Sequence, residues 1–160
     1  MRSEVAKARR SQLALLRVIE PDVAAGTNVT AIVELAAQAR LALASDILAV
    51  ADGLVRSGAR GSSAAAARSA ISRYYYAMFQ AVRAVVFVAV DGDDFNDHQE
   101  LPKRLPPNFP QRATWVNELK SARNSRNDAD YDPYPVASAY WLGQARSLKP
   151  VAHALVSRGR

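Results

Sequence analysis

Two long segments with apolar side chains at helical spacing constrain the fold of this 160-residue chain more than any other feature. In residues 30–57 the apolar positions recur every three or four residues, as on one face of an α-helix. They are Ile32, Leu35, Ala39, Leu43, Ile47, Val50 and Leu54. Residues 62–90 repeat the pattern at Ala67, Ile71, Tyr74, Met78, Val82, Val85 and Ala89. Helices of this length must bury their apolar faces against each other or against further helices.

Cap and turn residues set the expected limits of these two helices. Asn28 or Thr30 can cap the first, and Ser62 or Ser63 the second, because their side-chain oxygens accept hydrogen bonds from free backbone N–H groups. The glycine-containing step after residue 90, at Gly92, is expected to end the second helix. An aromatic cluster, "RYYYAMFQ", lies within that helix at residues 73–80. It exceeds one core face, so we expect at least one tyrosine to face away from the core or into an interface.

Two more helices and a long loop follow. The loop covers residues 91–111 and holds half of the eight prolines. A third helix is predicted for 112–126, with an inward face of Trp115, Leu119 and Ala122. The last is predicted for 135–157, with Val136, Tyr140, Gly143, Leu148, Val151 and Leu155 inward. Pro150 should kink or divide it.

The pattern therefore predicts an all-α fold, an antiparallel bundle of four to five helices. No segment alternates apolar and polar residues as a half-buried strand does. We assign residues 1–29 to an N-terminal basic helix and linker, and 30–160 to the bundle.

Composition excludes several functional classes. The chain has no cysteine and two histidines, His98 and His153, so disulfides, thiolate metal sites and a histidine zinc site are not expected. No cofactor is predicted. The longest apolar run, 84–90, is too short to cross a bilayer, and the first residues make a poor signal peptide. We expect a cytoplasmic protein without a membrane partner.

The charge distribution indicates a phosphate-facing surface. The net charge is +6, and 17 of the 21 basic residues are arginine, whose guanidinium group binds phosphate bidentately. Residues 103–126 hold six basic side chains and one acid, Glu118. The candidate phosphate- or RNA-binding residues are Arg112, Lys120, Arg123 and Arg126. The acidic loop at 91–100 lacks the spacing of a calcium loop.

The stretch "SARNSRNDADYDPYP", residues 121–135, concentrates polar groups where the third helix is expected to close. Arg123, Arg126 and Asn127 are placed in its last turn, and a cation there also suits the helix dipole. An arginine that holds a phosphate needs a base nearby to do chemistry. The polar groups available in the stretch are Asp128, Asp130, Tyr131 and Tyr134.

Three segments resemble the HEPN family (higher eukaryotes and prokaryotes nucleotide-binding). They are "ARLALASDILA" at 39–49, "SRYYYAMFQAVRAVV" at 72–86 and "ARNSRNDADYD" at 122–132. The third is similar to the R-N-x-x-A-D-Y form of the family, and His98 falls where many members carry a loop histidine. The likeness covers roughly residues 30–156 in the family's order.

The resemblance implies a helical bundle, often a homodimer whose shared cleft would be lined here by residues 120–134 of both chains. Many members are metal-independent ribonucleases of toxin–antitoxin or defence systems, paired with a nucleotidyltransferase antitoxin. In them an arginine holds the scissile phosphate and a histidine a few residues later helps the ribose 2′-hydroxyl to attack. Arg126 and Asn127 match the start of that motif, but Tyr131 stands where its shortest form has histidine.

Three hypotheses follow from this departure. The first is a nucleotide- or RNA-binding regulatory protein that works with a nucleotidyltransferase. The second is a ribonuclease toxin in which Arg126 and Asn127 act with Asp128, Asp130 or Tyr131 in place of histidine. The third is a structural adaptor bundle without a nucleic-acid role. In the histidine form the partner modifies a nearby tyrosine; the candidates here are Tyr131 and Tyr134.

Overall fold

The computed structural model describes Pro21, Gly26, Gly92 and the ranges 28–61, 63–90, 95–133 and 136–159. The N-terminal basic helix predicted within residues 1–29, and with it most of that segment, lies outside the described residues.

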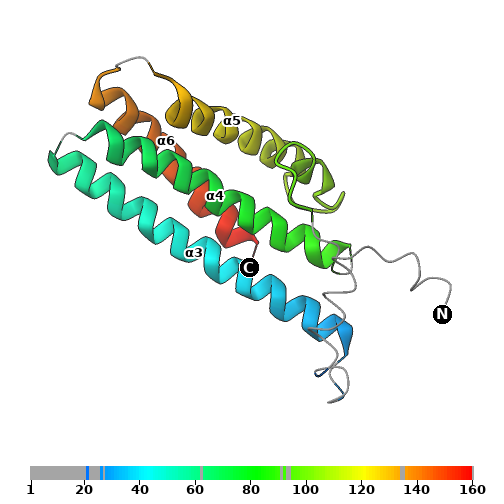
Figure 1. Ribbon diagram of the computed structural model, residues 1–160. Helices are drawn as coiled ribbons and strands as arrows, with labels where there is room; N and C mark the ends of the chain where they lie inside the picture. The colour runs from blue at the N-terminus through cyan, green and yellow to red at the C-terminus, as the bar shows by residue number, and fades with distance from the viewer. Residues whose placement is uncertain are drawn as a thin grey trace.

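The described chain is a bundle of four antiparallel α-helices and one short 3₁₀ turn (Figure 1). They are α3 (Val29–Gly61), α4 (Ala64–Ala89), η1 (Leu101–Arg104), α5 (Arg112–Tyr131) and α6 (Ser138–Arg158). No strand occurs within the ranges described. The predicted all-α bundle is confirmed. Within those same ranges no helix has the length and apolar character that a membrane span needs.

The predicted caps are present at both long helices. Asn28 Oδ1 accepts from the N–H of Ala31 at 2.8 Å, and Ser63 Oγ accepts from the N–H of Ala66 at 3.3 Å. At the end of α4 the N–H of Gly92 bonds the carbonyl of Phe87 at 2.8 Å, with Gly92 at φ +91°. Glycine adopts this left-handed conformation without steric cost, so the chain leaves the helix there.

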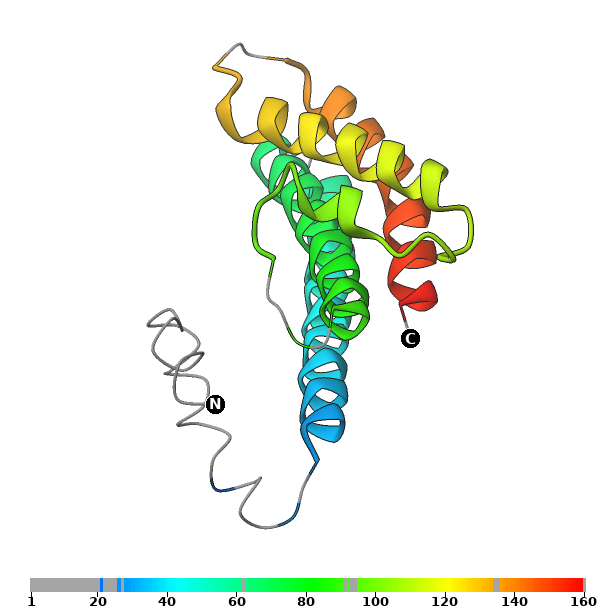
Figure 2. The same cartoon turned by 90° about the vertical axis from the view of Figure 1, so that its right-hand side faces the viewer.

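Helix α4 is the centre of the bundle. It contacts α3, α5, α6 and η1, and most of its side chains are buried. In Figure 1 it runs between α3 and α5 with α6 behind it, and in Figure 2 α5 crosses it at an angle. Alanines at positions such as Ala70, Ala77 and Ala84 let neighbouring backbones approach on several sides. The helix is therefore buried around most of its circumference, which accounts for its apolar and aromatic composition.

The face that α3 buries differs from the predicted one. The buried positions are Val33, Ala37, Ala44, Leu48 and Ala51. Four members of the predicted stripe are exposed instead: Leu35, Ala39, Leu43 and Val50. The prediction was wrong for these residues because α3 is apolar on two adjacent faces. The buried face includes three alanines, Ala37, Ala44 and Ala51, which permit close approach of α3 to α4.

The two C-terminal helices also depart from expectation. Helix α5 continues to Tyr131, so Arg126 and Asn127 lie inside the helix and do not close it. Helix α6 remains one helix across Pro150 and is not divided. Its inward residues are Trp141, Ala145, Ala152, Leu155 and Val156, whereas Val136, Tyr140 and Gly143 are exposed. Only Leu155 of the predicted face is fully buried.

Candidate phosphate-binding site

The three consecutive tyrosines of α4 bond three different polar partners, which come from three other parts of the chain. Tyr74 Oη donates to Asp52 Oδ1 on α3 at 2.6 Å. Tyr75 Oη lies 2.6 Å from Nδ1 of His98 in the loop after α4. Tyr76 Oη accepts from Arg126 Nη2 on α5 at 2.8 Å. The tyrosines exceed what one core face can hold, but all three hydroxyl groups find partners within a single chain, because α4 is packed on several sides.

The contact between Tyr75 and His98 lies at a polar pocket of about 190 Å³ between α4, α5 and the segment before η1. Its lining residues are Tyr75, His98, Gln99, Arg123, Arg126 and Asn127. Two guanidinium groups, two amide side chains and an imidazole therefore face one space. This combination supplies several donors to an anion and no carboxylate, as a phosphate site requires.

Arg126 is held by contacts with four neighbouring side chains. Besides Tyr76, Nη1 donates to Asn127 Oδ1 at 2.9 Å. Nε lies 2.9 Å from Asp130 Oδ2, close enough for an ion pair but not aligned for a hydrogen bond. The rings of Tyr76 and Tyr131 lie 5.4 and 5.3 Å from the guanidinium carbon. Partial burial opposes the charge, but Tyr76 and Asp130 outweigh it, and the pKa of Arg126 is raised.

Asp130 connects this arginine to α4. Its Oδ1 accepts a hydrogen bond from Ser72 Oγ, while Oδ2 pairs with Arg126 one helical turn away. The extension of α5 to Tyr131 makes this i, i+4 pair possible, because residues four apart face each other only on a continuous helix. Asp130 therefore positions Arg126, and it is not among the residues that line the pocket.

His98 is held in place from four directions. Asp97 Oδ1 accepts from the N–H groups of Gln99 and Glu100 at 2.6 and 3.0 Å, which fixes the turn on which His98 lies. Arg123 Nη1 donates to the carbonyl of His98 at 3.3 Å. The imidazole stacks on Phe79 with ring centres 4.2 Å apart, and Tyr75 bonds its Nδ1.

The surroundings of His98 favour the neutral imidazole. Burial, followed by the positive charge of Arg126, lowers its pKa below the ordinary value of 6.5. Burial raises the pKa of Tyr75 to about 12, so its hydroxyl keeps its proton at neutral pH. If Nδ1–H of the imidazole donates to Tyr75 Oη, Nε2 is left as an unprotonated base. In the other tautomer Nδ1 accepts from Tyr75 and Nε2–H is a donor.

The remaining predicted site residues lie outside this pocket or elsewhere on α5. Arg112 donates to the carbonyls of Leu105 and Lys103, both at 2.7 Å, and so orders the loop before α5. Lys120 and Asp128 are exposed on α5, and Tyr131 is 70% exposed at its end. Tyr134 lies outside the described residues.

His98 was absent from the predicted phosphate-binding and catalytic residues, although it lines the same pocket as Arg123 and Arg126. Sequence spacing could not place it beside Arg126, because it lies on a loop far from α5 in the chain. The only available signal was its position after the aromatic helix in the family resemblance.

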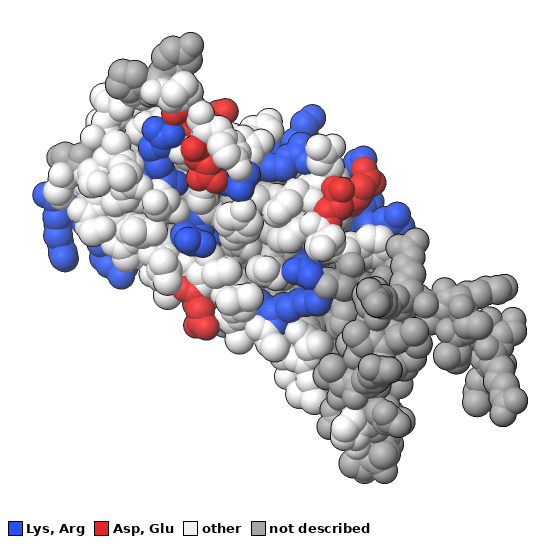
Figure 3. Space-filling view, in the orientation of Figure 1, with Lys and Arg blue, Asp and Glu red and all other residues white. Residues whose placement is uncertain are grey.

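Basic side chains are distributed over several helices. On the face in Figure 3 they form separate groups, several of them beside acidic side chains. Within the basic stretch 103–126, Lys103 pairs with Glu100 at 2.6 Å and Arg104 lies over the ring of Phe95. The concentrated charge at the site therefore comes from Arg123 and Arg126 rather than from the whole stretch.

A second polar cluster joins α3, α4 and α6 through Asp52. Its carboxylate accepts from Tyr74, lies 3.1 Å from Nε2 of His153 and pairs with Lys149 Nζ at 3.2 Å. Partial burial raises the pKa of Asp52, but the bonds from Tyr74, His153 and Lys149 outweigh it, and the net shift is downward. Among the residues that the structure covers, no three acidic or imidazole side chains gather as metal ligands do.

Comparison with known proteins gives no significant match to any family model, curated protein or solved structure.

Proposed function

We propose that this protein is a HEPN-like nucleotide- or RNA-binding protein in which the pocket between α4 and α5 receives a phosphate group. The observation that supports this is the convergence of Arg123 and Arg126 with His98 in one pocket of about 190 Å³. Two guanidinium groups at one small site suit a phosphodiester, because each can form charge-assisted hydrogen bonds.

The proposed partners follow from the resemblance. We propose a cytoplasmic regulatory protein that works with a nucleotidyltransferase in a toxin–antitoxin or defence system. A homodimer with residues 120–134 at a shared cleft belongs to the same proposal. It rests on the resemblance alone, since the tyrosines that suggested an interface bond partners within one chain.

Fluorescence anisotropy with a labelled single-stranded oligoribonucleotide tests the binding function. Replacing Arg123 or Arg126 with alanine should weaken binding by roughly 1.5–3 kcal/mol, the contribution of a hydrogen-bonded charged group. Arg146→Ala, which removes an exposed arginine from α6, is the charge-matched control. Equal losses in all three variants would show only non-specific attraction and would contradict the proposal.

The position of His98 favours RNA cleavage as a second candidate function. Its lowered pKa keeps it neutral near pH 7, so Nε2 can accept the proton of a ribose 2′-hydroxyl in the tautomer where Nδ1–H bonds Tyr75. The freed oxygen would attack phosphorus and break its bond to the 5′-oxygen, which takes a proton from solvent and leaves as an alcohol, and the product is a 2′,3′-cyclic phosphate. Arg123 and Arg126 would stabilise the charge that develops on the phosphoryl oxygens.

In this scheme His98 is the base, in place of the candidates Asp128, Asp130 and Tyr131 that the sequence offered. Asp130 is unsuited to that role because Arg126 and Ser72 already hold its two oxygens. Incubation with RNA in the presence of a chelator tests the scheme. Cyclic-phosphate products formed by the wild type and lost in His98→Gln support it. Cleavage that survives His98→Gln but is lost in Tyr131→Phe would assign the role to the tyrosine.

A further inference from the structure

Tyr131 is the most exposed large hydrophobic side chain of the described residues, with 70% of its surface accessible, and it stands beside the candidate phosphate pocket. Its ring centre lies 5.3 Å from the guanidinium carbon of Arg126, which itself lines the pocket. Another exposed tyrosine, Tyr140, packs edge-on against Trp141 with ring centres 5.1 Å apart. Tyr131 instead rests on a cation that the proposed phosphate would also contact.

We propose that Tyr131 is a stacking platform for an unpaired nucleobase whose phosphate occupies the pocket of Arg123 and Arg126. This inference rests on the phosphate-binding function proposed above and names the chemistry that the site selects. An exposed aromatic ring contributes most to the free energy of binding when a second flat apolar surface stacks on it. In a single strand each phosphate is joined through its ribose to an unpaired base, whereas in a duplex the bases are already stacked and paired.

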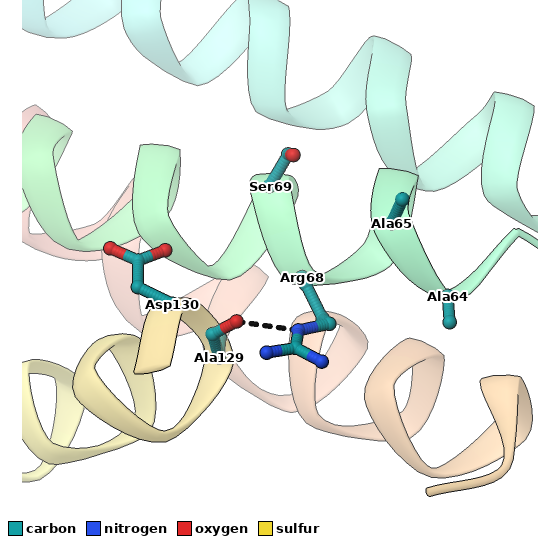
Figure 4. A pocket seen from close by; sticks show the side chains of 6 residues that line it. All are labelled: Ala64, Ala65, Arg68, Ser69, Ala129 and Asp130. Atoms are coloured by element: carbon teal, nitrogen blue, oxygen red, sulfur yellow. Dashed lines mark hydrogen bonds between the residues drawn. The ribbon is translucent and has the colours of Figure 1, made fainter. Parts of the chain in front are cut away.

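The surface between α4 and α5 has room for more than one nucleotide. Beyond Arg126 lies a second hollow of about 190 Å³, lined by Ser69, Ser72, Arg73, Tyr76 and Asp130. An open hollow of about 490 Å³ adjoins it at Ser69 and Asp130. Figure 4 shows this last hollow, where Arg68 of α4 points toward the end of α5 and donates to the carbonyl of Ala129. A strand that stacks one base on Tyr131 can therefore continue along the two helices.

The orientation of Tyr131 depends on how α5 ends. Arg68 donates from Nε to the carbonyl of Ala129 at 2.5 Å and from Nη2 to that of Asp132 at 2.8 Å. These two bonds flank Tyr131 in the chain and hold the last turn of α5 against α4. The ring thus stands on a fixed backbone, as a stacking platform requires, because a mobile ring loses more conformational entropy when a base binds.

The test compares ligands with and without an unpaired base. Binding of the full chain is measured for a single-stranded oligoribonucleotide, an abasic oligomer of the same length, the matching RNA duplex and a mononucleotide. The proteins are the wild type, Tyr131→Ala, Tyr131→Phe and Tyr140→Ala. Tyr140→Ala controls for the loss of an exposed tyrosine elsewhere. Circular dichroism confirms that each variant keeps its helices.

Tyr131→Ala should weaken binding of the single strand roughly fivefold or more, and leave the abasic oligomer unchanged. Tyr131→Phe should bind like the wild type because the ring remains. The same loss for the mononucleotide supports the inference and shows that one free nucleotide suffices.

Equal binding of the single strand and the abasic oligomer by the wild type would overturn the stacking role while leaving the phosphate site intact. An equal loss of both ligands in Tyr131→Ala would overturn it as well. If the wild type binds neither ligand, the proposed phosphate site fails, and the stacking role fails with it.

Discussion

The hydroxyl oxygen of Tyr75 lies 2.6 Å from Nδ1 of His98, so a buried residue of α4 orients the imidazole at the candidate site. Tyr75 is 2% exposed and cannot turn away without disturbing the core. The contact links the stability of the bundle to the geometry of the pocket, since α4 also carries Tyr76, which bonds Arg126. The site therefore depends on the central helix as well as on α5, where the sequence motif lies.

Arg126→Ala should raise the pKa of His98 toward 6.5, measured by NMR titration of the imidazole. The charge of Arg126 disfavours the imidazolium, so its removal makes protonation easier. Burial is the larger cause of the shift and remains, so the value should stay below 6.5. Arg146→Ala should leave the pKa of His98 unchanged. The NMR signal that disappears in His98→Gln is that of His98, which distinguishes it from the signal of His153. A pKa that is unmoved in Arg126→Ala would show that the two groups do not interact.

Oligonucleotide binding should strengthen as the pH falls below the lowered pKa of His98. Protonation adds a positive charge to the pocket, while the phosphodiester keeps its charge throughout this range. The slope of log K against log salt should steepen by about 0.7, the value for one more phosphate contact on a single strand. In His98→Gln both changes should disappear. Binding that weakens on acidification of the wild type would contradict a phosphate near His98.

Tyr74→Phe should destabilise the fold by about 1.5–3 kcal/mol in urea denaturation, because it removes a hydrogen bond from a buried hydroxyl to the carboxylate of Asp52. Tyr140→Phe should stay within about 0.5 kcal/mol, since Tyr140 is exposed. Burial, followed by the bond to Asp52, also raises the pKa of Tyr74. The contribution of Tyr74 to the free energy of unfolding is thus complete below its ordinary pKa of 10.0 and is lost as the pH rises through its raised folded-state pKa.

Asp52→Asn should change how stability responds to acid. The folded-state pKa of Asp52 is lowered, so its contribution is present above the ordinary value of 3.8 and is lost as the pH falls through the folded pKa. The stability gap between wild type and Asp52→Asn should therefore narrow below about pH 3.8. A gap that is constant from neutral pH down to strong acid would show that the partners of Asp52 do not stabilise its ionised carboxylate.

Arg68→Ala should loosen the end of α5, because it removes both bonds to the carbonyls of Ala129 and Asp132. Hydrogen exchange of the backbone at 128–132 should become faster, and unfolding easier by about 1–3 kcal/mol. Arg68→Lys should rescue little, since one ammonium group cannot reproduce the guanidinium fork. Arg73→Ala, at an exposed position of α4, is the matched control. Unchanged hydrogen exchange at 128–132 in Arg68→Ala would mean that other contacts hold the end of α5.

Local sequence information predicted where helices begin and end with useful accuracy. Asn28 and Ser63 cap the helices as expected, and Gly92 follows the end of α4. These features depend on a few neighbouring residues, so periodicity and cap chemistry suffice. The prediction placed the end of α5 too early, at 126 instead of Tyr131, because a run of Asn and Asp is usually a turn signal. There Arg68 and Ser72 of α4 hold the polar end of the helix.

The sequence by itself determined an all-helical chain with Arg126, Asn127 and Asp130 grouped along one segment. Only the tertiary structure decided which faces are buried and what stands beside Arg126. On α3 two adjacent faces are apolar, so hydrophobicity alone could not choose between Leu48 and Val50 for the core; packing against α4 made that choice. His98 reaches the pocket through the path of a loop and its stacking on Phe79. Such contacts depend on the angle at which helices cross and on where a loop returns, and neither is encoded in the spacing of residues along one helix.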